Sequence, residues 1–146
     1  MRPLQLLAVV TALILVSAEV TRAAEGVWSG LVIANNVPQP EPIPSELKKL
    51  EGTLKGLFGY NQFKVIGQSQ ETLKTGAEDW NATSKYFALR VNAKGKEEGA
   101  YLLNVRLFQE AKLLLEMDTR FSKSSPLVIK GPMVGDGQLL LVLVVQ

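Results

Sequence analysis

Residues 139–145 read LLLVLVV, seven apolar side chains in succession. A strand with water on one face alternates apolar and polar residues, whereas an unbroken run of this length indicates a strand covered on both faces. Burial of each such side chain contributes about 1.5–3 kcal/mol before the entropy cost is subtracted. We therefore expect this strand to be covered by a helix predicted at 45–58 or by a second sheet.

A second strand with two apolar faces is predicted at 24–36. In GVWSGLVIANN, residues 26–36, one face carries Val27, Leu31 and Ile33, while the other carries Trp28, Val32 and Ala34. Residues 37–44, VPQPEPIP, have proline at every second position from 38, which excludes a helix or a central strand. This segment is predicted to be a stiff connector.

The apolar period becomes helical after the connector. Ser45 stands where an N-cap is expected, and Gly59 stands where a helix ends through a left-handed residue. Between them, apolar residues fall on one stripe at helical spacing: Leu47, Leu50, Leu54, Leu57 and Phe58. These features predict one amphipathic helix over 45–58.

The remaining chain has a period of two, which is typical of strands. Alternating segments at 62–70, 87–92, 101–107, 113–118 and 127–130 are separated by turn signals, 76–84 is predicted to be a loop carrying Trp80, and Asp136-Gly137 is predicted to be a hairpin turn. The predicted fold class is α+β. One amphipathic helix packs on an antiparallel meander sheet or a small β-sandwich, and 24–36 and 45–146 form one domain.

The first 23 residues have the order of a secretory signal peptide. Arg2 precedes an apolar run from 4 to 16, and small residues follow. Cleavage after Ala23 is preferred over cleavage after Ala18, and an uncleaved anchor is the alternative. The run is shorter than the roughly 20 residues that a membrane-spanning helix needs. We therefore expect an exported protein of the periplasm or extracellular space that is not an integral membrane protein after cleavage.

The composition excludes several kinds of site. The chain has no cysteine and no histidine, which rules out disulfides, Cys/His zinc sites and histidine-dependent catalytic triads. Sixteen basic and fourteen acidic side chains leave a net charge of +2, which argues against a dedicated nucleic-acid binder. No acidic cluster has a spacing suited to a metal, so neither a metal nor a cofactor is expected.

One pair of motifs has the residue types of a serine acyltransferase. Ser45-x-x-Lys48 and Lys74-Thr75-Gly76 occur together in enzymes of the penicillin-binding and β-lactamase type. Lys48, however, lies beside Lys49 on the predicted solvent face, and the second motif follows much sooner than in those larger domains. A capped helix is therefore the preferred interpretation, and no catalytic residue is assigned.

Pairs of carboxylates could also serve a glycosidase. Two of the three pairs fall in predicted turns, where acidic side chains are usually solvated, and the third lies on the polar face of a strand. The pairs are Glu78/Asp79, Glu97/Glu98 and Glu116/Asp118.

Lys48, Lys49 and Lys55 give the predicted helix a basic surface. This surface could meet an acidic partner or anionic lipid headgroups. The alternative is an ordinary solvated face. We treat the three lysines as a possible partner surface.

Three stretches resemble a pattern in exported bacterial proteins: LKKLEGTLKGLFGYNQFKVIG at 47–67, VRLFQ at 105–109 and GPMVGDGQLLLVLVV at 131–145. In those proteins a helix ending in an aromatic pair leads into strands and a closing hairpin. The resemblance covers 47–145. No activity is assigned to such proteins, so the resemblance implies none here.

The leading hypothesis is an exported, non-enzymatic envelope protein that binds another protein or supports an assembly. This hypothesis rests on a sequence that has the pattern of a well-formed core but no recognisable group of catalytic residues. One alternative is a binder of a small apolar or lipid ligand, which requires a cavity between helix and sheet. The other is a hydrolase that uses Ser45 and Lys48 or a carboxylate pair.

Overall fold

The computed structural model describes residues 24–146. The predicted signal peptide, 1–23, and its two cleavage positions lie outside the described residues. The strands are β1 (Glu25–Asn35), β2 (Gln62–Leu73), β3 (Asp79–Thr83), β4 (Phe87–Glu97), β5 (Ala100–Gln109), β6 (Lys112–Phe121), β7 (Leu127–Val134) and β8 (Gly137–Val145). A 3-10 helix, η2 (Ser45–Leu50), runs directly into the α-helix α2 (Glu51–Phe58).

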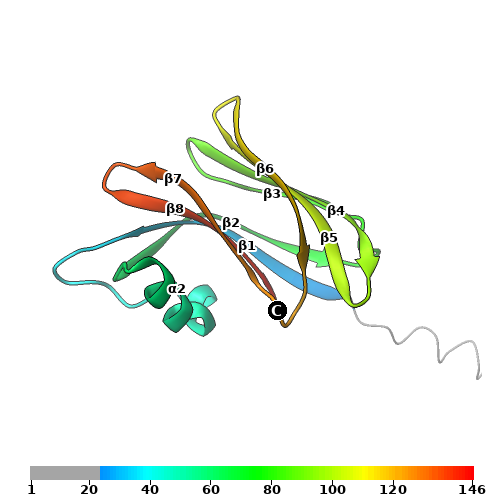
Figure 1. Cartoon of the computed structure of the whole chain (residues 1–146), viewed down its shortest axis with the longest axis horizontal. Coiled ribbons are helices and arrows are strands. Elements are labelled where there is room, and N and C mark those ends of the chain that lie inside the picture. Colours follow the sequence, from blue (N-terminus) through cyan, green and yellow to red (C-terminus); the bar gives the residue numbers. More distant parts are fainter. Residues whose placement is uncertain (1–23) are drawn as a thin grey trace, which may run out of the picture.

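The strands divide into two four-stranded antiparallel sheets. The central sheet has the order β2-β1-β8-β7, and the outer sheet has the order β3-β4-β5-β6. Figure 1 shows the helices on the side of the central sheet that faces away from the outer sheet. The predicted α+β class is confirmed, in a β-rich form with one short helix. The strands form two sheets rather than the single meander that was one of the two predicted arrangements, since β1 pairs with β8 as well as with β2.

The two strands predicted to be covered on both faces occupy the middle of the central sheet. Val27 and Leu31 of β1 contact the core between the sheets, while Trp28 and Val32 contact the core beneath the helices. The closing strand β8 alternates in the same way. Its odd-numbered residues 139–145 face the outer sheet, and Leu140 and Val142 face the helices. Both predictions of two-sided burial are thus confirmed.

The helical segment begins differently from the prediction. Pro44, not Ser45, occupies the N-cap position, no side chain caps the helix, and the Leu47 N–H donates to the Pro44 carbonyl over 3.0 Å. This bond spans three residues, so the first turns are a 3-10 helix and only 51–58 is α-helical. Ser45 is therefore not the predicted cap. Gly59, at φ +70°, ends the helix as predicted.

The apolar stripe of the helical segment is narrower than predicted. Leu47 and Leu54 are fully buried against the central sheet, and Phe58 is partly buried. Leu57 is 68 % exposed, because Leu54 and Phe58 lie closer to the direction of the sheet on a helix of 3.6 residues per turn. The predicted placement of Leu57 on the buried stripe is therefore wrong.

The predicted loop around Trp80 is also wrong, because 79–83 forms strand β3. Trp80 and Ala82 face the core, and the other three residues of the strand, Asp79, Asn81 and Thr83, are exposed. The closing hairpin turns at Gly135, which has φ +62°, and Asp136, one position earlier than predicted. Within the described residues, no helix is long and apolar enough to cross a membrane.

Candidate functional site

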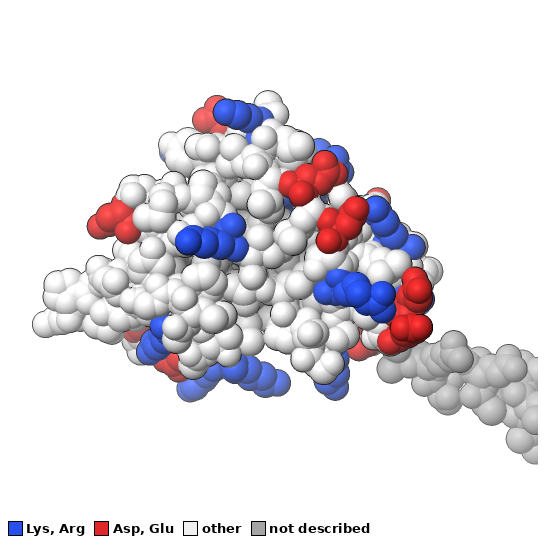
Figure 2. Space-filling view, viewed as in Figure 1, with Lys and Arg blue, Asp and Glu red and all other residues white. Residues whose placement is uncertain are grey.

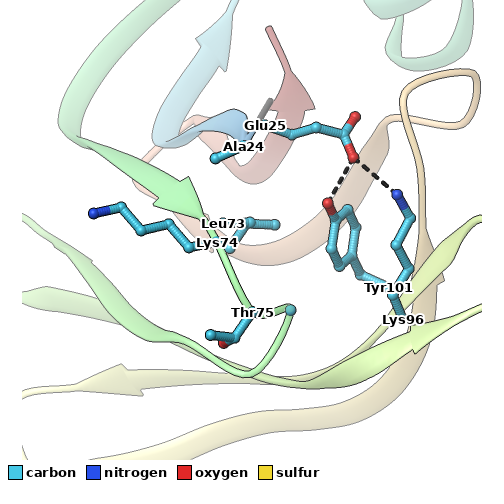
Figure 3. A pocket seen from close by; sticks show the side chains of 8 residues that line it. Ala24, Glu25, Leu73, Lys74, Thr75, Lys96 and Tyr101 are labelled. Carbon is cyan, nitrogen blue, oxygen red and sulfur yellow. Dashed lines mark hydrogen bonds and ion pairs between the residues drawn. The ribbon is translucent and has the colours of Figure 1, made fainter. Parts of the chain in front are cut away.

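A cavity of about 590 Å³ lies at one end of the two-sheet core. Its wall combines the start of β1, the end of β2 with the loop that follows it, and the hairpin between β4 and β5. The lining side chains are drawn in Figure 3, and they are Ala24, Glu25, Leu73, Lys74, Thr75, Gly76, Lys96 and Tyr101. A volume of this size is within the range of small-molecule sites.

Three polar side chains in this cavity satisfy one another. The Tyr101 hydroxyl donates to Glu25 Oε1 over 2.6 Å, and Lys96 Nζ donates to the same oxygen over 3.2 Å. The Lys96 ammonium also lies 5.1 Å from the centre of the Tyr101 ring. Because Glu25 belongs to the central sheet and Tyr101 to the outer sheet, their hydrogen bond joins the two sheets.

The pKa values of this group move away from neutrality. The hydrogen bond from Tyr101, aided by Lys96, lowers the pKa of Glu25 against the opposing effect of burial. Burial, followed by the hydrogen bond to Glu25, raises the pKa of Tyr101 to about 12. A general acid or base works best when its pKa is near the operating pH. Glu25 as a carboxylate and Tyr101 as a neutral phenol are therefore suited to binding rather than to proton transfer.

The Lys74–Gly76 loop beside the cavity is closed by its own carboxylate. Glu78 accepts the backbone N–H groups of Lys74 at 2.7 Å, Thr75 at 2.9 Å and Gly76 at 3.0 Å. These bonds, that from Thr75 first, lower the pKa of Glu78. A loop whose N–H groups all point at one carboxylate has no donors left for an external anion.

The two halves of the serine acyltransferase pattern are not brought together. Lys74, Thr75 and Gly76 line the cavity just described, whereas Ser45 lines another cavity, of about 390 Å³, between η2 and the end of β8. The Ser45 hydroxyl donates to Glu46 over 3.2 Å, and no hydrogen bond joins it to Lys48 in the described part of the chain. This geometry offers no activated nucleophile at Ser45.

The carboxylate pairs lie in separate, open surroundings. Glu97 and Glu98 are exposed at the hairpin between β4 and β5. Glu116 and Asp118 are exposed on β6, where each accepts a hydrogen bond from Asn104 over 3.1 Å. The bond from Asn104 and the ammonium of Lys94 lower the pKa of Asp118.

The remaining pair divides between two roles. Glu78 closes its loop as described, and Asp79 accepts a hydrogen bond from the Asn92 amide. None of the three pairs faces an enclosed cavity as a pair. Among residues 24–146, no group of three acidic side chains is placed to hold a metal ion.

The predicted basic helix surface is present in part. Lys48 and Lys49 are exposed, but Lys55 forms an ion pair of 2.7 Å with Glu51 one turn away. Figure 2 shows basic side chains along the lower border of the molecule, on the side where Figure 1 places the helices. Lys49 and Lys123 also line the cavity beside Ser45.

One feature of the structure has no signal in the sequence: the two-sheet core is open on one side. Strands β6 and β7 are each an edge of their sheet and do not pair with one another. The inward side chains of Leu115, Leu127 and Ile129 stay partly exposed there, and Met117 is 36 % exposed. In Figure 2, the surface between the β7–β8 hairpin and β6 is largely uncharged. The alternation of β6 was predicted, but its position at an edge follows only from the strand order.

The chain shows no significant match to family models, curated proteins or solved structures.

Proposed function

We propose that this is an exported, non-enzymatic module of the cell envelope that binds another protein by pairing a strand of that protein with the free edge of β6. The observation that carries the proposal is β6 itself. It is a ten-residue edge strand with partly exposed apolar side chains beside the core. Edges of this kind are templates for strand addition.

The other three edges are each protected. Strand β3 has only five residues, and its Thr83 carbonyl lies so close to Gly67 of β2 that a Cβ on that glycine would collide with it. This contact covers the β2 and β3 edges together. Strand β7 contains Pro132 and a register shift between Lys130 and Met133, and both features hinder pairing. Strand β6 contains neither proline nor glycine, and its own register shift against β5, at Leu114, leaves residues 115–121 in regular pairing.

The side chains of β6 define what a partner strand should offer. Leu115 and Met117 lie opposite the buried Leu107 and Val105 of β5, so they face the core. Apolar residues of an added strand would extend the core at these positions. On the other face, the exposed carboxylates of Glu116 and Asp118 favour basic residues across the new pair. The partner segment is therefore expected to be extended, with alternating apolar and basic side chains.

The same geometry gives less support to the two alternatives. A lipid site between helix and sheet would need an apolar cavity there, but Leu47 and Leu54 are fully buried in that layer, and the cavity of about 390 Å³ at its end is lined partly by charged side chains, those of Glu46, Lys49 and Lys123. A hydrolase would need Ser45 activated by Lys48 or a carboxylate pair facing a cavity, whereas the Ser45 hydroxyl donates to Glu46 and the carboxylate pairs lie in separate, open surroundings. Exposed Lys48 and Lys49 remain a second proposed contact surface on the helices.

The proposal is tested by placing a photoreactive amino acid on β6 in the cells that produce the protein. The position is Thr119, whose side chain faces the core edge, and the control position is Lys64 on β2, which is exposed. We expect one crosslinked product of defined mass from Thr119 and none from Lys64. The change Met117→Lys, which puts a charge on the edge, should abolish the product, whereas Leu57→Lys should not.

Three results would count against the proposal. They are equal products from both positions, no product from Thr119 in a folded protein, and a product with twice the mass of the chain. A product with twice the mass of the chain would indicate that the protein associates with itself rather than with another protein.

A further inference from the structure

The exposed face of the outer sheet places two arginines directly opposite each other. Arg90 of β4 and Arg106 of β5 are register partners, and their neighbours Leu89, Val91 and Val105 are buried. Both guanidinium groups therefore lie on the face away from the core. Like charges at directly opposed positions destabilise a sheet, so this pairing requires a compensating reason.

Neither of the two guanidinium groups forms an ion pair in the described part of the chain. The ion pairs within residues 24–146 join Lys55 to Glu51, Lys94 to Asp118 and Lys96 to Glu25, so neither arginine takes part in one. Glu116 is the register partner of Arg106 on β6, but its carboxylate accepts from the Asn104 amide.

Arg106 also carries an incompletely satisfied donor. Its Nε is buried and has no hydrogen-bond partner in the described part of the chain. A buried donor without an acceptor is costly and uncommon in folded proteins. The site thus holds two guanidinium groups that no ion pair within the described residues compensates, and one of them carries an unsatisfied buried donor.

Phe108 holds both arginines in place. The guanidinium carbon of Arg90 lies 4.9 Å from the centre of the Phe108 ring, and that of Arg106 lies 5.8 Å from it. Contact with an aromatic ring orders these long side chains, while the outer N–H groups of a guanidinium can still bind an oxyanion in a bidentate manner.

An apolar row borders the arginines. Phe108 has Ala88 as its register partner on β4 and Leu113 on β6, and Leu113 is 46 % exposed. The face therefore presents a pair of cations beside a strip of exposed carbon. A ligand that fits both rows has an oxyanion joined to an apolar or ring-shaped body.

We propose that Arg90, Arg106 and Phe108 form a binding site for an organic phosphate or sulfate ester. The two guanidinium groups bind the oxyanion, and the organic group rests on the row of Ala88, Phe108 and Leu113. The arginines and Phe108 take no part in the proposed strand addition, although both proposals use residues of β6: Leu113 here, and the backbone edge, the core-facing side chains, Glu116 and Asp118 there.

The test is a titration of the folded protein with three probes. Binding is monitored through the NMR signals of the arginine side chains. The probes are inorganic phosphate, phenyl phosphate and phenyl sulfate. We expect saturable shifts at Arg90 and Arg106 and tighter binding of the two esters than of inorganic phosphate. Each single change, Arg90→Gln or Arg106→Gln, should weaken ester binding about tenfold, because each removes charge-assisted hydrogen bonds. Comparison of the two ester affinities shows whether the site prefers a phosphate or a sulfate group.

Arg120→Gln is the matched control. Arg120 lies on the same sheet, but its guanidinium donates to the Glu97 carbonyl over 3.1 Å, so its loss should leave ester binding unchanged. A second readout separates binding from a structural role. Arg90→Gln removes the repulsion between the arginines. It should therefore raise the thermal midpoint of unfolding while it weakens ester binding.

The proposal is overturned if binding survives in the folded double variant or if Arg120→Gln weakens binding equally. It is also overturned if no probe saturates, if inorganic phosphate binds as well as the esters, or if Arg90→Gln lowers the thermal midpoint.

Discussion

The indole N–H of Trp80 donates a hydrogen bond of 2.8 Å to the hydroxyl of Ser29 inside the core. Trp80 belongs to β3 of the outer sheet and Ser29 to β1 of the central sheet, so the bond fixes how the sheets sit on one another. Ser29 is 0 % exposed. Water therefore cannot take the place of either partner.

Replacement of Ser29 by alanine should lower the free energy of unfolding by about 1–3 kcal/mol, because the Trp80 N–H is left buried without an acceptor. Ser69 is the control, since it is the register partner of Ser29 on β2 and its own hydroxyl is buried without a partner. Ser69→Ala should lower the free energy of unfolding much less than Ser29→Ala, or even raise it. Urea unfolding of both variants checks this, and equal losses would show that the indole bond has no special weight.

Gly30 leaves space for the Trp28 ring, which lies across it. A Cβ at Gly30 would collide with the far end of that indole, and the indole is held by a bond of 2.8 Å from its N–H to Gln68 Oε1. Gly30→Ala should therefore destabilise by about 1–3 kcal/mol, as overpacking of a core usually does. Gly26 on the same strand has open space at this position, so Gly26→Ala should be tolerated. The thermal midpoints of unfolding of the two variants test this prediction, and equal midpoints would contradict it.

Two glycines in α2 weaken the helix without any packing reason. A Cβ at Gly52 or Gly56 would meet no atom within 4 Å, and neither residue has positive φ. Gly52→Ala and Gly56→Ala should each raise the free energy of unfolding by about 0.5–1 kcal/mol. Gly59→Ala is the contrasting variant, because Gly59 has φ +70° and should lose stability. A loss of stability at Gly52 would mean that another molecule packs there.

The Tyr101–Glu25 bond should make stability depend on pH at both ends of the scale. The pKa of Tyr101 rises from 10.0 to about 12 in the folded protein, so its contribution is complete below the unfolded value and is lost as the pH rises toward the folded one. The pKa of Glu25 is lowered, so its contribution is present above the ordinary carboxyl range and is lost as the pH falls through the lowered value.

Tyr101→Phe tests this dependence. The variant should be less stable near neutral pH by about 1.5–3 kcal/mol, since it lacks a hydrogen bond to a carboxylate. The difference from the natural protein should shrink as the pH is raised through about 10–12, because Tyr101 ionises there only in the natural protein. Urea titrations across that range measure the difference, and a constant difference would contradict the prediction.

The sequence was most informative where apolar residues run without a break. Strands β1 and β8 could be predicted with both faces covered, because apolar residues predominate on both faces of each strand. Strand β3 could not, because only Trp80 and Ala82 of its five residues face the core and its other positions are polar. The 3-10 start of the helix was hidden too, since the bond from Leu47 to Pro44 replaces the expected cap at Ser45.

The candidate sites depended on information that local patterns do not carry. Glu25 and Tyr101 are 76 positions apart, and they meet only because the starts of β1 and β5 lie at the same end of the stacked sheets. Likewise, period two predicted that 113–118 is a strand but not that it is an edge. Arg90 and Arg106 became a pair only through the register of β4 and β5.

The central sheet joins the first strand of the described chain to the last one, because β1 pairs with β8 along its length. Contacts so distant along the chain have high contact order, which slows folding. During synthesis, β1 must wait for residues made more than a hundred positions later before its second neighbour arrives. A polypeptide that cannot complete its core during synthesis remains unfolded for longer and can still pass through a narrow translocation pore. Delayed folding is therefore compatible with the export that we propose. By the same logic, a premature stop shortly before β8 should abolish the native state rather than trim it.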